Sequence, residues 1–129
     1  MKIIITLITA ILVISCGQKQ EAKTNDASAA LPAQTPEEHG KILFESRGNC
    51  FACHKPDQAV IAPSLVEIAN IYKQKNGNMV AFLQGKEEPI VDPDRFAVMK
   101  TNFSITKNMS EEELKAIEAY VYSFHQPTK

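Results

Sequence analysis

The stretch Cys50-Phe51-Ala52-Cys53-His54 places two thiols and an imidazole side by side in the chain. The sequence of 129 residues holds three cysteines, and the third, Cys16, stands alone near the N-terminus. An odd number of cysteines indicates that at least one of them does something other than form a disulfide. The close pair and the lone cysteine therefore need separate explanations.

The spacing of the close pair, C-x-x-C-H, is typical of covalent haem attachment. Two thiols separated by two residues can reach both vinyl groups of one haem as thioethers, and the adjacent imidazole can then bind the iron. We therefore expect one haem c bonded to Cys50 and Cys53, with His54 as the proximal iron ligand.

Three other readings of the pair remain open at the level of sequence. A structural zinc site needs four ligands, usually from two close pairs, and neither His39 nor His125 has a suitable companion. A thioredoxin-like redox pair requires a strand-to-helix context, whereas the surrounding pattern is helical. A plain local disulfide is the third alternative.

The N-terminal segment has the features of an export signal. Lys2 supplies a positive charge, and residues 3–14 are apolar apart from Thr6 and Thr9. This apolar segment is too short to cross a bilayer core of about 30 Å as a helix, and its length and flanks fit a signal peptide. We expect residues 1–15 to be removed from the mature protein.

The lone cysteine follows this signal directly. The run that ends in Ser15-Cys16-Gly17 resembles the lipobox of bacterial lipoproteins, which implies cleavage before Cys16 and lipidation of its thiol and new amine. More than one acyl chain gives stable membrane anchoring. Residues 16–34 are polar and small, so we expect a lipidated flexible tether there, followed by a folded domain over residues 35–129.

Helix signals fill the chain after residue 34. Thr35 with Glu38, and Ser110 with Glu113, form two capping boxes that predict helix N-termini. Apolar residues at helical spacing predict helices over about residues 35–47, 63–75, 78–84 and 110–126. Residues 86–109 contain two prolines and are expected to be irregular. No segment alternates with period two, so no strand is expected.

The methionines offer a sixth ligand for a haem iron, and methionine opposite histidine raises the reduction potential. Met79 lies on a predicted amphipathic helix and suits the core. Met109 precedes the cap Ser110 and can form a hydrophobic staple with Leu114. Met99 lies in the expected loop ahead of the last helix, where a chain can cross a haem face. We predict that Met99 is the second iron ligand.

From Thr35 to Phe124 the sequence resembles class I cytochromes c. Gly40 and Phe44 are four residues apart, as in the first helix of that family. The resemblance implies that this helix face crosses the last helix against an aromatic side chain, for which Tyr120 is the candidate.

Two further positions carry the resemblance. The Pro-x-Leu of the family appears as Pro63-Ser64-Leu65, which implies that the Pro63 carbonyl accepts the Nδ1 hydrogen of His54 and orients the ring. The axial methionine of the family sits upstream of the last helix, as Met99 does. Many members have proline after that methionine, whereas Lys100 stands here.

The resemblance implies an all-α class I cytochrome c fold, with about four helices around one covalently bound haem c. The expected function is electron transfer between Fe(III) and Fe(II), without bond chemistry on a substrate. The alternatives are an electron-input subunit of a larger membrane or periplasmic oxidoreductase, and a haem protein with an open sixth position for ligand sensing or peroxidatic chemistry.

The net charge bears on the expected partners, and the N-terminal signal on the expected location. The net charge of −1 leaves no basic footprint for nucleic acid. We expect a monomer that exchanges electrons with redox protein partners. We place it in the envelope of a bacterium, lipid-anchored to a membrane with its haem domain in the periplasm.

Overall fold

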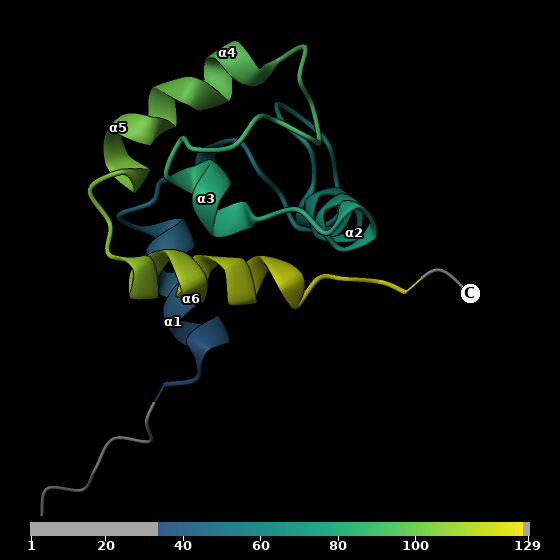
Figure 1. The fold of residues 1–129 in the computed structure, drawn as a ribbon. Helices are drawn as coiled ribbons and strands as arrows, with labels where there is room; N and C mark the ends of the chain where they lie inside the picture. The colour runs from purple at the N-terminus through teal and green to yellow at the C-terminus, as the bar shows by residue number, and fades with distance from the viewer. Residues whose placement is uncertain (1–33, 128–129) are drawn as a thin grey trace, which may run out of the picture. The chain divides into compact units, whose positions relative to one another are not determined.

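The computed structural model describes residues 34–127. Cys16, the predicted signal peptide and most of the predicted tether lie outside the described residues. Within residues 34–127 all the regular secondary structure is helical, without a strand, which confirms the all-α expectation (Figure 1). The elements in chain order are α1 (Pro36–Glu45), η1 (Cys50–Ala52), α2 (Leu65–Lys75), α3 (Met79–Leu83), α4 (Phe96–Met99), η2 (Lys100–Asn102), α5 (Phe103–Thr106) and α6 (Glu111–Tyr122).

Both predicted capping boxes are present. The Thr35 hydroxyl accepts a hydrogen bond from the backbone of Glu38, and the Glu38 carboxylate accepts one from the backbone of Thr35. Ser110 and Glu113 exchange the same pair of bonds at the start of α6. Each box satisfies backbone N–H groups that the first turn of a helix leaves without partners.

The helix ends differ from the sequence expectations by a few residues. Helix α1 stops at Glu45 and α6 at Tyr122, both earlier than predicted. Helix α2 ends at Lys75, and the left-handed residue that follows it is Asn76, with a φ of 50°, one position before the glycine that was expected to end the helix. Asparagine tolerates this conformation better than most residues, so it can end the helix where glycine was expected to.

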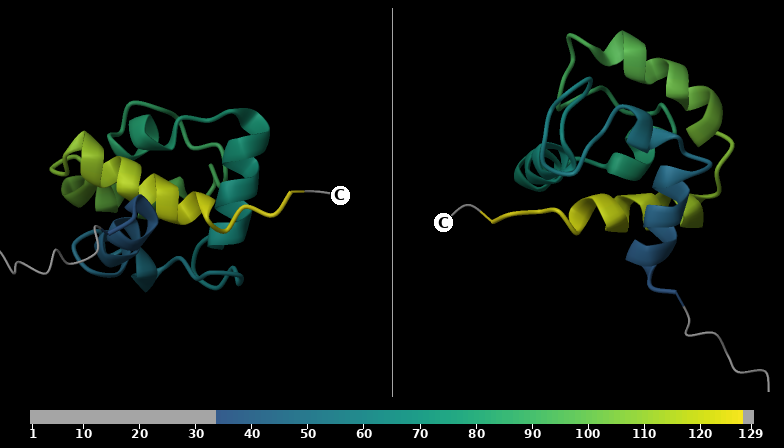
Figure 2. Two further views of the ribbon diagram at one scale, coloured as in Figure 1. Left: turned by 90° about the horizontal axis from the view of Figure 1, so that it is seen from below. Right: turned by 180° about the vertical axis from the view of Figure 1, so that it is seen from behind.

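Helices α1 and α6 make the most extensive helix–helix contact, and they cross in each view of the fold (Figure 2). Gly40 lies at the crossing, where a Cβ atom would be 1.8 Å from the backbone oxygen of Ala116. One turn further along, the rings of Phe44 and Tyr120 pack edge to face, with centroids 5.3 Å apart. The structure thus confirms the crossing that the resemblance implied.

The expectation of an irregular chain over residues 86–109 is wrong for its second half. Helices α4 and α5 and the 3-10 turn between them follow one another from Phe96 to Thr106. Phe96, Met99 and Phe103 are spaced i, i+3 and i+7, so they fall on one side of this helical segment. We refer to residues 96–106 as the Met99 segment.

The close crossing predicts that glycine is required at position 40. In the variant Gly40→Ala, higher helix propensity should contribute about 1 kcal/mol of stability. The added methyl group would meet backbone rather than a movable side chain, and overpacking of this kind costs about 1–3 kcal/mol. We expect a net loss in the free energy of unfolding, measured by guanidinium chloride titration.

The matched control is Lys41→Ala, on the exposed side of the same helix. It introduces alanine one position away without meeting α6. A Gly40→Ala protein at least as stable as Lys41→Ala would contradict the steric argument.

Candidate functional site

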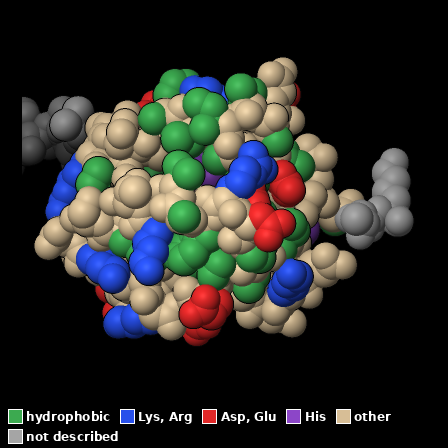
Figure 3. Space-filling model, turned by 90° about the horizontal axis from the view of Figure 1, so that it is seen from above, with side chains coloured by type: hydrophobic (Ala, Val, Ile, Leu, Met, Phe, Trp, Pro, Cys, Tyr) green, Lys and Arg blue, Asp and Glu red, His purple; other side chains and the backbone are tan. Residues whose placement is uncertain are grey.

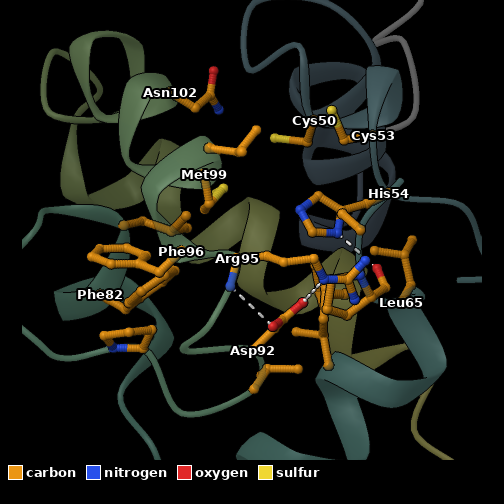
Figure 4. Close-up of a pocket in the computed structure, with 18 of the residues that line it drawn as sticks. Cys50, Cys53, His54, Leu65, Phe82, Asp92, Arg95, Phe96, Met99 and Asn102 are labelled. Carbon is orange, nitrogen blue, oxygen red and sulfur yellow. Dashed lines mark hydrogen bonds and ion pairs between the residues drawn. The ribbon is translucent and has the colours of Figure 1, made fainter. Parts of the chain in front are cut away.

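A single turn of chain holds the two thiols and the imidazole. Asn49 takes a left-handed φ of 49° after the end of α1 and starts the turn. The backbone N–H groups of Cys53 and His54 both donate to the carbonyl of Cys50, at 3.1 and 3.0 Å. This turn brings all three side chains to one side of a pocket (Figure 4).

The two thiols differ in their surroundings. Both are free rather than joined as a disulfide, and Cys50 is buried while Cys53 is partly exposed. Burial raises the pKa of the Cys50 thiol to about 11, so this group is protonated at neutral pH. Its Sγ donates to the Gly48 carbonyl at 3.4 Å. The local disulfide considered above is therefore not formed.

The imidazole of His54 is oriented by a backbone carbonyl. Nδ1 lies 2.7 Å from the oxygen of Pro63, and because a carbonyl can only accept, Nδ1 carries the hydrogen. Burial lowers the pKa of His54, which favours the neutral ring. Nε2 is then left with a lone pair that can bind a metal. The structure thus contains the hydrogen bond that the resemblance implied.

The position of the Pro63 carbonyl is itself fixed by helix α2. Pro63 is buried and directly precedes Ser64, whose hydroxyl caps α2 by accepting from the backbone of Glu67 at 3.1 Å. The backbone of Leu65 also donates to the Lys55 carbonyl at 2.9 Å, which closes the loop that follows His54. The ring orientation therefore depends on where α2 begins.

The turn over residues 49–54, here called the attachment turn, faces a cavity of about 310 Å³. This volume is at the lower end of the range for cofactor sites. Met99 lines this cavity and lies across it from His54 (Figure 4). Met79 lines it too, but is 3% exposed and belongs to the buried core. Met109 is buried at the start of α6, outside the cavity lining.

Aromatic rings pack behind Met99. The rings of Phe82, Phe96 and Phe103 contact one another, with centroids 5.5 to 5.8 Å apart. Phe82 comes from α3, and the other two come from the Met99 segment. Such edge-on and tilted contacts are favourable for aromatic pairs. The contacts of Phe96 and Phe103 with Phe82 therefore pack the Met99 segment against α3.

Three polar side chains at the cavity were missed by the sequence analysis. Arg95 pairs with Asp92 at 2.5 Å and donates to the carbonyl of Ile61 at 3.2 Å. Asn102 donates to the carbonyl of Gly48 at 3.0 Å. No short motif marks Arg95 and Asn102, because the carbonyls to which they donate lie 34 and 54 residues away in the chain. The helical spacing of Phe96, Met99 and Phe103, in contrast, was a signal that could have placed the segment.

One side of the cavity reaches the protein surface. Ile61 and Val98 line the cavity, yet they are 58% and 65% exposed. Viewed from above the fold, hydrophobic side chains extend across the middle of the face, with lysine, arginine and acidic side chains around them (Figure 3). A group held in the cavity would therefore have an edge close to the exposed side chains of Ile61 and Val98.

The residues present fit a haem group. Two free thiols, an imidazole nitrogen and a thioether surround a cavity whose remaining lining is mostly apolar, as a porphyrin requires. Among residues 34–127, no cluster of three or more histidine, cysteine or acidic side chains is placed to hold a metal ion. The zinc alternative therefore has no ligand set in the part of the chain described.

Comparison with known proteins points to the same cofactor. The family model described as cytochrome c matches residues 37–124, which is most of the chain. The chain belongs to the cytochrome c family. No curated protein sequence gives a significant match.

Family membership establishes the cofactor and the broad function. This cytochrome c carries covalently bound haem c with its iron, and haem-based electron transfer is its activity. Cytochrome c domains are typically extracytoplasmic in bacteria. Within residues 34–127, no helix is long and apolar enough to span a membrane.

Proposed function

We propose that this cytochrome c is a membrane-anchored monohaem electron carrier, with Cys50 and Cys53 as the haem attachment sites and His54 and Met99 as the iron ligands. The observation that carries the proposal is the placement of His54 and Met99 on opposite sides of one apolar cavity. The haem supplies the redox chemistry, with its iron alternating between Fe(III) and Fe(II).

The contacts of His54 suit it to bind iron. The Pro63 carbonyl, 2.7 Å from Nδ1, fixes the ring plane and makes the ring a stronger donor through Nε2. The low pKa that burial gives His54 keeps the ring neutral before any metal binds. These two effects act together, since one orients the lone pair and the other keeps it available.

Among the methionines, Met99 is the best placed for the sixth position. It is partly buried and only packs against the core cluster, so its thioether is not required as core filling. Met79 and Met109 are 3% and 7% exposed and are members of that cluster. Methionine opposite histidine raises the reduction potential relative to two nitrogen ligands.

The apolar opening of the cavity suits short encounters with redox partners. Ile61 and Val98 flank the cavity at the surface, and weak redox complexes bury comparatively little area. We propose a monomer that docks a donor and then an acceptor protein at this face. The lipid on Cys16 would confine these encounters to the membrane surface, in the periplasm of a bacterium.

The ligand assignment is tested by volume-conserving substitutions of methionine by leucine. Met99→Leu should abolish the weak near-infrared band of a methionine–iron(III) bond, because it removes only the thioether. Met79→Leu and Met109→Leu are the matched controls, and both should keep the band. Persistence of the band in Met99→Leu would show that another side chain is the ligand.

Covalent attachment is tested by the pyridine haemochrome spectrum of the purified protein. Wild type should give the spectrum of a haem with two thioether bonds, and each single variant, Cys50→Ala or Cys53→Ala, the spectrum of one thioether. The double variant should release its haem into acidified organic solvent. A wild-type protein from a cytochrome-competent host that contains no covalent haem would contradict the proposal.

The membrane anchor is tested at Cys16. The mature protein should begin at Cys16, with a mass increased by its acyl chains, and should fractionate with membranes. Cys16→Ser should remove the acyl mass and the membrane association, whereas Ser15→Ala, which leaves the thiol in place, should keep both. An unmodified Cys16 in the exported wild-type protein would refute the anchor while leaving the haem site unaffected.

A further inference from the structure

The Met99 segment consists of pieces too short to hold themselves in place. Helices α4 and α5 have four residues each, and the turn η2 between them has three. Isolated helices of this length are unstable in water, because nucleation is unfavourable and few hydrogen bonds follow it. The position of Met99 must therefore be set by contacts with the rest of the domain.

Asn102, three residues after Met99, makes one such contact. Its amide Nδ2 donates to the Gly48 carbonyl at 3.0 Å, and the side chain is partly buried at the cavity. Gly48 is buried and precedes the left-handed Asn49 that starts the attachment turn. One hydrogen bond thus joins the Met99 segment to the backbone that carries the two thiols.

Haem attachment makes this bond more important. The thiol of Cys50 also donates to the Gly48 carbonyl, at 3.4 Å. When that thiol adds to a vinyl group, a sulfur–carbon bond forms and the thiol hydrogen moves to the neighbouring vinyl carbon. The sulfur then has no hydrogen to donate. In the described part of the chain, Asn102 is left as the side-chain donor to this buried carbonyl.

Arg95, four residues before Met99, makes a similar contact at the other end. Its Nη1 donates to the Ile61 carbonyl at 3.2 Å, in the loop between His54 and Pro63. The Asp92 carboxylate holds the guanidinium through Nε at 2.5 Å and also accepts from the Arg95 backbone. Asp92 therefore orients the Arg95 side chain, whose Nη1 donates to the loop (Figure 4).

We propose that Asn102 and Arg95 are positioning residues that form a clasp, holding Met99 opposite His54. Arg95 lies before Met99 and binds the Ile61 carbonyl. Asn102 lies after Met99 and binds the Gly48 carbonyl. Both carbonyls belong to the loop that also carries the two thiols and Pro63. This inference rests on the proposed function, because it takes Met99 as the iron ligand.

The aromatic contacts do not replace the clasp. Phe96 and Phe103 pack against Phe82, but Phe82 lies on α3, so these contacts do not connect the segment to the loop that carries the thiols and Pro63. Hydrogen bonds weaken steeply when donor and acceptor are misaligned. The rings hold the segment against the domain, while the two hydrogen bonds fix its register relative to the cavity.

The chain offers a matched control for each half of the clasp. Asn108 is an exposed asparagine whose amide donates to Ser104 within the same region, away from the cavity lining. Arg47 pairs with Glu113 and donates to the Asn108 carbonyl, so it makes the same two kinds of contact as Arg95 between other elements. The test compares Asn102→Ala with Asn108→Ala, and Arg95→Gln with Arg47→Gln.

The first readout is the rate at which imidazole displaces methionine from the Fe(III) protein. The second is hydrogen exchange of the backbone amides over residues 96–106. Loss of one hydrogen bond contributes about a factor of ten, so Asn102→Ala should speed displacement roughly tenfold. Arg95→Gln should act in the same direction with a smaller effect, because its side chain is more exposed. Neither control should change the displacement rate, whatever its effect on global unfolding.

The outcomes separate the clasp from the ligand assignment. If wild type shows the methionine–iron(III) band and both clasp variants match their controls, the clasp is wrong and the proposed function stands. If wild type lacks the band, the assignment of Met99 is wrong and the clasp is overturned with it. If Asn102→Ala fails to accumulate, the comparison of Arg95→Gln with Arg47→Gln tests the clasp by itself. Arg95→Gln removes the hydrogen bond to the Ile61 carbonyl, and Arg95 is exposed.

Discussion

The rest of the domain depends on the close approach of α1 and α6 at Gly40 and Ala116. Because no side chain separates the two backbones there, the distance between the helices has little freedom. The attachment turn begins a few residues after α1 ends, so the crossing also determines where the thiols lie. The same α6 also contributes side chains to the cavity lining.

The features that sequence could predict are those with short-range causes. Capping boxes, the glycine and aromatic pair on α1, and the C-x-x-C-H turn each involve residues within a few positions of one another. The Met99 segment was not predicted, because Pro89 and Pro93 indicate an irregular chain just before it. The ties made by Asn102 and Arg95 could not be predicted, because their acceptors are backbone carbonyls 54 and 34 residues away. A carbonyl has no sequence signature, so only the fold shows which one a side chain reaches.

The cavity makes the core incomplete without the cofactor. Side chains from α2, α3 and α6, among them Leu65, Leu83 and Ile117, belong to the buried core and also line the cavity. A domain of this size buries a limited share of the surface of its unfolded chain. A large apolar group adds buried area without adding chain to be ordered, so it stabilises the fold at little cost in conformational entropy. Thioether bonds make that contribution permanent in a way that packing alone would not.

The loop over residues 48–63 accepts hydrogen bonds from side chains on both sides of the cavity. Its carbonyls at Gly48, Ile61 and Pro63 receive hydrogen bonds from Asn102, Arg95 and His54 in turn. Because the acceptors are backbone groups, the geometry depends on the path of the loop. That path is fixed by the attachment turn at one end and by the capped start of α2 at the other. The same short stretch of backbone therefore orients the imidazole directly and the methionine through its flanking residues.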